Sequence, residues 1–200
     1  MTLTVIVTRP AAQGDAFVNA IKQRVGDTCE VVHAPLIEIV LLPVTADLSA
    51  ITDLIFTSAN GVAAAARLDL SKGRRAWCVG PKSAQLAQEA GFETMQGPGD
   101  AAGLVTHILN ETPTGNFAHI RGQHARGDIC GHLNIAGLRC ADVIAYDQQA
   151  LSLTDAAQTA LKGKMPVVFP LYSQRTATIM SGQRLFTAPL HCDMMSDAER

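Results

Sequence analysis

The chain has 200 residues, of which 48% are hydrophobic and only 4% aromatic, so its core must be built mainly from Ala, Val, Ile and Leu. Sixteen Lys and Arg against 18 Asp and Glu, with no long basic run, argue against a nucleic-acid partner. No apolar span has membrane length, the amino terminus lacks a secretory pattern, and five scattered cysteines without a CxxC pair do not suggest a disulfide framework. We therefore expect a cytoplasmic protein with no membrane partner.

The first 43 residues predict one strand–helix unit followed by an extended connector. Thr2–Thr8 is rich in β-branched residues, and Ala11–Val25 has helical periodicity before the stop signal Gly26. Cys29–His33 predicts a second strand. Leu36–Pro43 is apolar but is not followed by a helix, and a parallel partner would need a crossover. We interpret it as an extended connector between two bodies.

From Asp53 onward, strands and helices alternate, which is typical of a doubly wound parallel sheet in an α/β protein. Strands are expected at Leu54–Thr57, Arg75–Val79, Phe92–Met95, Asn116–Ile120, Leu138–Tyr146 and Val167–Leu171. Helices are expected at Ala59–Leu68, Pro81–Ala90, Ala101–Leu109, Asp128–Ala136, Thr154–Leu161 and from Ser173 onward.

The stretch 53–66, DLIFTSANGVAAAA, predicts a buried strand, an N-capping serine and a helix start. Free N–H groups near Asn60 and Gly61 could bind an anionic oxygen, and a missing side chain at Gly61 would allow close approach. A capped helix without a ligand is the alternative. Phe169–Met180 repeats this layout, with Ser173 in the place of Ser58.

Polar residues follow the carboxyl ends of the predicted strands, which is where ligands bind in open α/β sheets. They are hydroxyls, glycines and cations, and acids are few, which suits a polyanionic ligand. Capping, surface exposure or packing is the alternative for each. The residues are Thr8, Arg9, Thr57, Ser58, Asn60, Gly61, Gly80, Lys82, Ser83, Arg121 to Arg126 (which includes Gly122), Tyr146, Ser173 and Arg175.

Other motifs give no support for a cofactor or a metal. Gly97, Gly99 and Gly103 have the wrong register for dinucleotide binding, and neither a P-loop nor a serine nucleophile elbow is present. Four residues lie close in sequence but match no compact ligand set, so we interpret them as ordinary polar loop residues. They are His119, His124, Cys130 and His132.

Seven short motifs occur in the order seen in one known family. They are VTRP at 7–10, APLIEI at 34–39, LIFTSANGV at 54–62, CVGPKSA at 78–84, HIRG at 119–122, VIAY ending at Tyr146, and a later Ser173. The chain resembles the uroporphyrinogen-III synthases over nearly its whole length. The resemblance implies two flavodoxin-like α/β lobes joined by a two-stranded antiparallel ladder. The first lobe, 1–36 plus 150–200, would be discontinuous, the ladder would comprise 37–43 and 145–149, and the second lobe would be 44–144.

The resemblance also implies a reaction, cyclisation of hydroxymethylbilane with loss of water and inversion of ring D, in haem, chlorophyll and cobalamin biosynthesis. The enzyme would hold this linear tetrapyrrole, which bears eight carboxylates, folded in a cleft between the lobes, without a cofactor. Tyr146 would assist departure of the hydroxyl group, and the other strand-end residues would bind the substrate. The alternatives are a non-catalytic synthase-like module that binds a tetrapyrrole or a protein, and a flavodoxin-like cofactor domain that stacks a ring on Trp77 or Tyr146.

Two features depart from the family pattern. Members usually continue past the element at Ser196–Ala198, so we expect a shortened first lobe with an exposed sheet edge, and a monomer that can associate through that edge. Pro170 lies inside a predicted buried strand, where it removes a hydrogen-bond donor, so this strand should be irregular or lie at an edge.

Overall fold

The structure is a computed structural model that describes residues 3–111, 114–125, 127–171, 173–183 and 187–194. The predicted element at Ser196–Ala198 and the predicted strand-end residue Arg126 lie outside these ranges. The chain forms two compact units, which we call unit 1 (Met1–Glu38 and Gln149–Arg200) and unit 2 (Ile39–Gln148). Among the described helices, none is long and apolar enough to cross a membrane.

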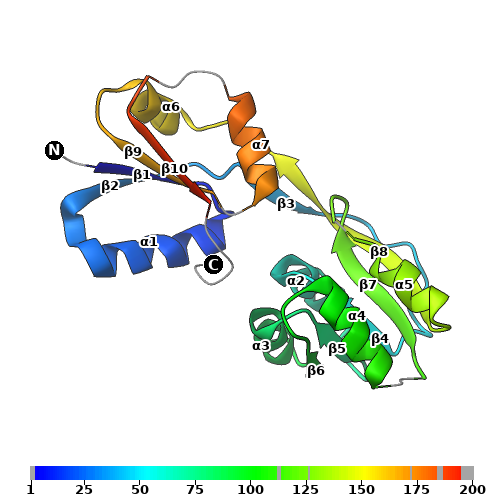
Figure 1. Cartoon of the computed structure of the whole chain (residues 1–200). Helices are drawn as coiled ribbons and strands as arrows, with labels where there is room; N and C mark the ends of the chain where they lie inside the picture. Colours follow the sequence, from blue (N-terminus) through cyan, green and yellow to red (C-terminus); the bar gives the residue numbers. More distant parts are fainter. Residues whose placement is uncertain (1–2, 112–113, 126, 172, 184–186, 195–200) are drawn as a thin grey trace. The chain divides into compact units, whose positions relative to one another are not determined.

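Unit 1 contains a four-stranded parallel sheet in the order β10-β9-β1-β2 (Figure 1). Its strands are β1 (Leu3–Val7), β2 (Cys29–His33), β9 (Val167–Leu171) and β10 (Leu190–Met194). Its helices are α1 (Ala11–Val25), the short 3-10 helix η1 (Gly26–Thr28), α6 (Asp155–Lys162) and α7 (Gln174–Gly182). The predicted elements are present, and Gly26, with φ of 59°, ends α1 as expected.

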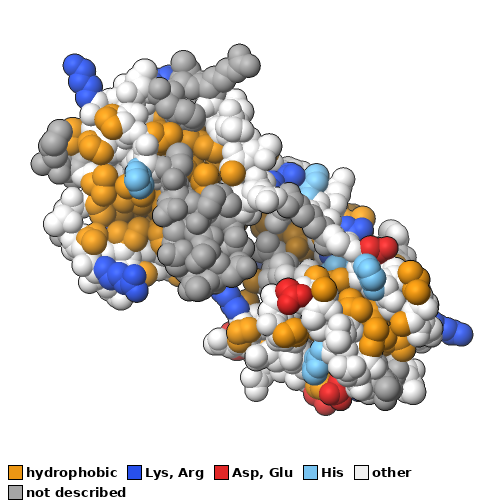
Figure 2. Space-filling view, in the orientation of Figure 1, with side chains coloured by type: hydrophobic (Ala, Val, Ile, Leu, Met, Phe, Trp, Pro, Cys, Tyr) orange, Lys and Arg blue, Asp and Glu red, His pale blue; other side chains and the backbone are white. Residues whose placement is uncertain are grey.

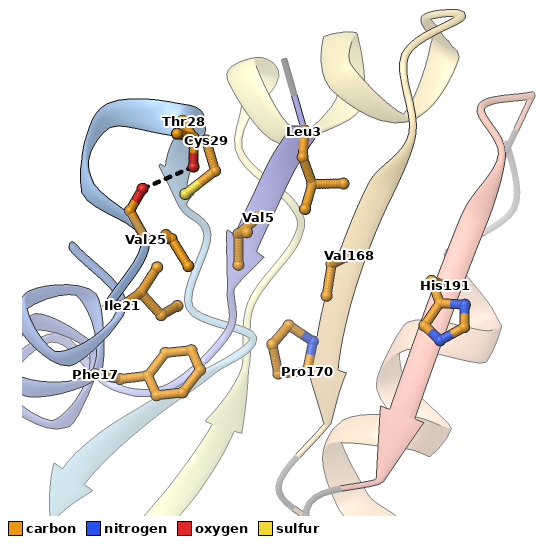
Figure 3. Close-up of a pocket in the computed structure, with 10 residues that line it drawn as sticks. All are labelled: Leu3, Val5, Phe17, Ile21, Val25, Thr28, Cys29, Val168, Pro170 and His191. Carbon is orange, nitrogen blue, oxygen red and sulfur yellow. Dashed lines mark hydrogen bonds between the residues drawn. The ribbon is translucent and has the colours of Figure 1, made fainter. Parts of the chain in front are cut away.

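The two faces of the unit 1 sheet are covered by different helices. Ile6 and Phe169 pack with Leu161 of α6 and Met180 of α7 on one face, whereas Val5 packs against α1 on the other. On the α1 face a pocket of about 330 Å³ lies between Phe17 and Ile21 of the helix and Val168 and Pro170 of β9 (Figure 3). Figure 2 shows hydrophobic side chains gathered on the surface of unit 1.

Pro170 lies in an interior strand, because β9 pairs with both β1 and β10. Of the two alternatives predicted for this strand, the edge position is therefore wrong. The ladder between β1 and β9 involves Val167 and Val168 and ends before Pro170, so the missing N–H does not interrupt it. Beyond that ladder, the Thr8 hydroxyl donates to the Pro170 carbonyl over 3.2 Å and links the two strands.

Unit 2 is built on a six-stranded sheet in the order β3-β8-β7-β4-β5-β6. Its strands are β3 (Ile37–Leu41), β4 (Asp53–Phe56), β5 (Arg75–Cys78), β6 (Glu93–Gln96), β7 (Asn116–Gly122) and β8 (Arg139–Ala150). Its helices are α2 (Ala59–Arg67), α3 (Pro81–Glu89), α4 (Ala101–Asn110) and α5 (Ile129–Ile135). The pairs from β8 through β7, β4 and β5 to β6 are parallel, which confirms the predicted α/β class with parallel sheets.

Unit 2 is doubly wound, because alternate side chains of its strands enter two separate cores. Phe56 and Leu54 of β4 pack with α2 and α3, whereas Ile55 packs with Leu104 of α4 and Leu133 of α5. Every residue of β4 is buried, as expected for a central parallel strand.

The connector predicted at Leu36–Pro43 forms β3, which pairs with β8. Leu42 N–H donates to the Ala145 carbonyl, and Leu151 N–H donates to the Leu36 carbonyl, each over 2.9 Å. Residues later in β3 thus pair with residues earlier in β8, so the two strands are antiparallel. The sheet is therefore mixed, with one antiparallel strand at its edge.

The fully buried carboxylate of Asp53 is the centre of a polar cluster at the amino end of β4. The carboxylate accepts hydrogen bonds from Trp77 Nε1 at 2.8 Å and Thr52 Oγ1 at 2.6 Å, and it pairs with Arg75 Nε at 2.8 Å. Trp77 is 1% exposed. The indole is therefore part of the core and cannot stack on a cofactor ring, which removes one basis for the flavodoxin-like alternative.

The cysteines differ from the expectation that they stay unpaired. Cys130 of α5 and Cys140 of β8 form a disulfide, with their Cα atoms 4.9 Å apart. The chain separation of 10 residues does not form a CxxC motif, and the pair is brought together because α5 packs against the strand that follows it. Cys29 and Cys78 are free.

Candidate functional site

In the unit 2 sheet, the chain goes from β4 to β5 on one side and from β7 to β8 on the other side. The strand order therefore changes direction between the neighbouring strands β4 and β7. In open α/β sheets the crevice at the carboxyl ends of such strands is where ligands bind, because the outgoing loops diverge there. β4 ends at Phe56 and leads into Thr57 and Ser58, while β7 ends at Arg121 and Gly122. Predicted site residues from both strands thus lie at the switch point of one sheet.

Ser58 connects the start of α2 to Tyr146. Its Oγ accepts a hydrogen bond from Gly61 N–H at 3.2 Å, which confirms the predicted N-cap, and it lies 2.9 Å from Tyr146 Oη. Tyr146 is 5% exposed, so its ring is fixed by packing. A chain of hydrogen bonds therefore runs from a helix N-terminus, where the dipole is positive, to a phenol hydroxyl. Asn60 lies half-buried in the first turn of the same helix.

Two glycines allow this packing. A Cβ at Gly122 would lie 2.6 Å from Tyr146 Cε2, and one at Gly61 would lie 2.6 Å from the Ile120 carbonyl oxygen. The ladder between β7 and β8 is also irregular at Gly122, which pairs with Tyr146. The absent side chain of Gly61 thus allows α2 to approach β7, whereas the sequence suggested that it makes room for a ligand.

Thr57, His119 and Asp142 form a second chain of polar contacts. His119 Nε2 lies 3.2 Å from Thr57 Oγ1, and its Nδ1 lies 3.1 Å from Asp142 Oδ1. Burial lowers the pKa of His119, while Asp142 opposes that shift and Arg121 adds to it. A neutral imidazole that donates from Nδ1 to the carboxylate must accept at Nε2. The Thr57 proton then points to His119, and its oxygen lone pairs face away.

His119 falls in the predicted strand Asn116–Ile120 but was interpreted as a polar loop residue, and that interpretation is wrong. It lies in β7 with 1% exposure, and Cys130 and His132 lie in α5; of the four residues only His124 lies in a turn, where it contacts Asp147. Alternation along β7 could have revealed its burial, because His119 lies two residues after Phe117 and shares its face. Asp142 was missed because only the β7–β8 register places it opposite His119.

Arg121 lies beside the same carboxylate. Its Nε is 3.0 Å from Asp142 Oδ1, as an ion pair without an aligned hydrogen bond, and its Nη1 donates to the Gly122 carbonyl over 3.2 Å. The guanidinium is thus held next to the switch point by two groups of unit 2.

Gly80, Lys82 and Ser83 lie at the start of α3, beside α2 in the fold. Ser83 is buried, and its Oγ both donates to the Gly80 carbonyl at 2.9 Å and accepts from Gly80 N–H at 3.3 Å. Lys82 is exposed. The Ser83 hydroxyl is therefore committed to the helix start, and Lys82 is the residue of this group with a solvent-facing charge.

Unit 1 has its own switch point, between β1 and β9, and three predicted residues follow these strands. Thr8 is fully buried and bonded to Pro170, so it holds the strands together. Arg9 follows it and is half-buried. Ser173 caps α7 by accepting from Thr176 N–H at 3.1 Å, as Ser58 caps α2.

The chain thus has two α/β units, each with hydroxyls and helix N-termini at the switch point of its own sheet, an arrangement typical of proteins that bind small anionic molecules. The family model for uroporphyrinogen-III synthase HemD matches residues 15–183, and the chain belongs to this family. The family predicted from the ordered motifs is therefore confirmed.

Solved structures support the fold. Uroporphyrinogen-III synthetase from Helicobacter pylori 26695 aligns over 100% of this chain and 86% of its own, with a TM-score of 0.69 and 17% identity. A mutant uroporphyrinogen III synthase from the extremely thermophilic bacterium Thermus thermophilus aligns over 98% of this chain and 85% of its own, with a TM-score of 0.56 and 15% identity. A search of curated protein sequences found no significant match.

Proposed function

We propose that this protein closes hydroxymethylbilane, with loss of water and inversion of ring D, and that the carboxyl end of the unit 2 sheet binds part of this substrate. The family supports the reaction, and the Ser58–Tyr146 pair is the observation that supports the location. The substrate bears eight carboxylates, so helix N-termini, Lys82 and Arg121 are suitable partners. We also propose that the enzyme is cytoplasmic and monomeric.

Tyr146 would act on the departing hydroxyl group. If Ser58 accepts from Gly61 and donates to Tyr146 Oη, the phenol proton is free to point at the leaving oxygen. Loss of that hydroxyl as water requires a proton, and a donor held at the oxygen lowers the barrier. Each donor in this chain polarises the next, which strengthens the last hydrogen bond.

Thr57 would have a different role from the one suggested by sequence. Because its proton points to His119, its oxygen can accept a hydrogen bond but cannot donate one to a carboxylate. A pyrrole N–H is the donor that the substrate offers. We propose that Thr57 accepts from a pyrrole ring, while Ser58, Asn60, Lys82 and Arg121 bind carboxylates. Thr8, Arg9 and Ser173 would contribute from unit 1.

Inversion of one ring would depend on restraint of the substrate more than on a reactive group. Without the enzyme the chain closes uninverted, so the enzyme must favour attack at the substituted carbon of ring D. Positioning of reacting atoms can contribute roughly 7–11 kcal/mol to such a step. Fixed groups such as the packed Tyr146 ring and the capped α2 helix are suited to this task.

The first test compares wild type with Tyr146→Phe on freshly made hydroxymethylbilane, with separation of the type III and type I isomers. We expect wild type to form type III, and Tyr146→Phe to lower kcat by about 100-fold or more with a smaller change in KM. The variant keeps the ring that packs on Gly122, so its fold should persist. Type I alone from the wild type would contradict the synthase function and favour a binding module. Unchanged turnover in the variant would contradict only the role of Tyr146.

A further inference from the structure

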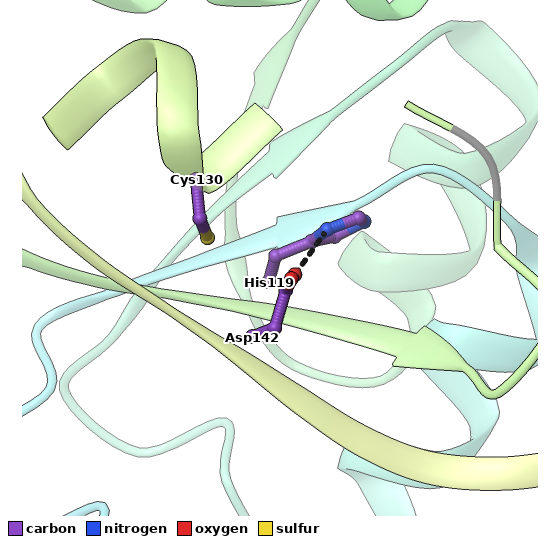
Figure 4. Close-up of side chains that lie close together, drawn as sticks. All are labelled: His119, Cys130 and Asp142. Atoms are coloured by element: carbon purple, nitrogen blue, oxygen red, sulfur yellow. Dashed lines mark hydrogen bonds and ion pairs between the residues drawn. The ribbon is translucent and has the colours of Figure 1, made fainter. Parts of the chain in front are cut away.

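Three potential metal ligands converge in unit 2. His119 of β7 and Asp142 of β8 are direct partners in the strand register, and Cys130 reaches them from α5 (Figure 4). One ligand atom from each of these three residues lies within 4.8 Å of the other two. An imidazole, a cysteine sulfur and a carboxylate thus meet within a space comparable to a metal coordination sphere.

Cys140 adds a second sulfur to this group. It precedes Asp142 by two residues in β8, so both side chains leave the strand on the same face. Its disulfide with Cys130 places the two sulfurs together. Reduction of that bond would therefore leave the Cys130 thiol beside His119 and Asp142, with the Cys140 thiol as its neighbour.

We propose that reduction of the Cys130–Cys140 disulfide creates a Zn²⁺ site whose ligands are Cys130, Cys140, His119 and Asp142. Zinc prefers four ligands of this kind, in tetrahedral geometry, and sulfur and imidazole nitrogen are its commonest protein ligands. The oxidised form cannot bind in this way because both sulfurs are in the disulfide. Cys130 and Cys140 can therefore either form the disulfide or bind the metal, but not both at once.

The surrounding charges favour a divalent cation in the reduced form. Two thiolates and the Asp142 carboxylate carry three negative charges, and Zn²⁺ supplies two positive charges. Arg121 Nε, 3.0 Å from Asp142 Oδ1, supplies the remaining one. The site with metal is neutral in sum, whereas without metal the thiolates would repel each other and the carboxylate.

The contacts of His119 leave the correct nitrogen for the metal. Its Nε2 lies 3.2 Å from Thr57 Oγ1, and its Nδ1 is the nitrogen beside Asp142. Zn²⁺ would replace the proton on Nδ1, and Nε2–H would then donate to Thr57. A second partner of this kind orients most metal-bound histidines. The side chain of Asp142 is 35% exposed, so the ion has a path from solvent.

The chemistry balances with a thiol reductant or a phosphine. Two electrons and two protons convert the disulfide to two thiols, and a phosphine takes up oxygen from water to become its oxide. Zn²⁺ then displaces the two thiol protons as it forms two Zn–S bonds. In reverse, oxidised glutathione takes two electrons from the zinc-bound thiolates and two protons from solvent to give two thiols, the S–S bond re-forms, and Zn²⁺ is released.

The test titrates the full-length protein with Co²⁺, a coloured substitute for Zn²⁺, before and after reduction with a phosphine. We expect one Co²⁺ per chain only after reduction, with sulfur-to-cobalt charge-transfer absorption and the visible bands of tetrahedral cobalt. Zn²⁺ should displace Co²⁺, and oxidised glutathione should then release the Zn²⁺ to a chromogenic chelator. Cys29→Ser, at a free cysteine of unit 1, is the control and should behave as wild type.

Cys130→Ser removes one of the two sulfur ligands and should lower the charge-transfer absorption by at least half at equal Co²⁺. Asp142→Asn keeps both cysteines and should weaken binding by about 10-fold or more, which gives a second measurement if Cys130→Ser fails to fold. Reduced wild type that binds no Co²⁺ above the level of Cys130→Ser would overturn the proposal. Equal binding by oxidised and reduced protein would also overturn it. Both outcomes leave the isomer assay unaffected, so they are separable from failure of the synthase function.

Discussion

The two ends of the unit 2 sheet hold polar groups in different ways. At the amino end, the Asp53 carboxylate meets Trp77, Thr52 and two nitrogens of Arg75, which together fill its four acceptor positions. At the carboxyl end, the hydroxyls of Ser58 and Tyr146 share one hydrogen bond and keep further capacity. A buried carboxylate whose acceptor positions are all filled stabilises the fold, whereas hydroxyls with remaining capacity can bind a ligand. We therefore expect substitutions at the amino end of the unit 2 sheet to lower stability, and substitutions at its carboxyl end to lower activity.

The largest expected effect is a loss of stability on substitution of Asp53 at the amino end of the unit 2 sheet. Asp53→Ala leaves the Trp77 N–H and the Arg75 guanidinium without their partner, and the free energy of unfolding should fall by roughly 3–5 kcal/mol. Denaturant titration checks this, and Lys72→Ala is the control. Lys72 pairs with Asp69 on the surface, where loss of an ion pair costs about 0–1 kcal/mol. Equal losses in the two variants would contradict the structural role of the Asp53 cluster.

Gly122→Ala should act mainly on turnover. The added Cβ would lie 2.6 Å from Tyr146 Cε2, so the ring and its hydroxyl must shift. Displacement of a reacting group by about 1 Å can lower the rate by roughly 100-fold. The measurement is kcat of the folded variant, with Gly182→Ala as the control, since nothing lies within 4 Å of a Cβ there. Wild-type kcat in Gly122→Ala would show that the position of Tyr146 is unimportant.

Cys78, at the carboxyl end of β5, should make stability depend on alkaline pH. Burial raises the pKa of its thiol from 9.0 to about 11. Above pH 9 the unfolded chain loses this proton first, so stability is complete below pH 9 and decreases as the pH rises to about 11. The loss should be roughly 1–3 kcal/mol. Denaturation of wild type and Cys78→Ala across this range isolates the contribution, and parallel curves would contradict it.

The strand–helix alternation and the extended connector at Leu36–Pro43 could be predicted because apolar runs, caps and glycine stops are local signals. The Ser58 cap could also be predicted for this reason. The antiparallel partner of the connector was predicted only from the family resemblance. The Tyr146–Ser58 contact spans 88 residues and depends on the strand order, which no local pattern fixes. The role of Gly122 depends on a register shift between two strands, and the Cys130–Cys140 bond depends on how α5 packs. These features arise from tertiary packing, so the sequence motifs predicted where the candidate site lies but not which residues contact one another there.

The smallest expected effects come from two helix-cap variants, which test whether the Ser58 cap also has a functional role. Ser58 caps α2 at the switch point, and Asp100 caps α4 after the edge strand β6, accepting from Gly103 N–H at 2.8 Å. Loss of either cap should cost about 1 kcal/mol of stability. Ser58→Ala also removes the partner of Tyr146 and should lower kcat by roughly 10-fold, the equivalent of one lost hydrogen bond. Asp100→Ala should leave kcat unchanged. If both variants lose stability equally and neither loses turnover, Ser58 is only a cap, and the carboxyl end of β4 resembles the amino end in being purely structural.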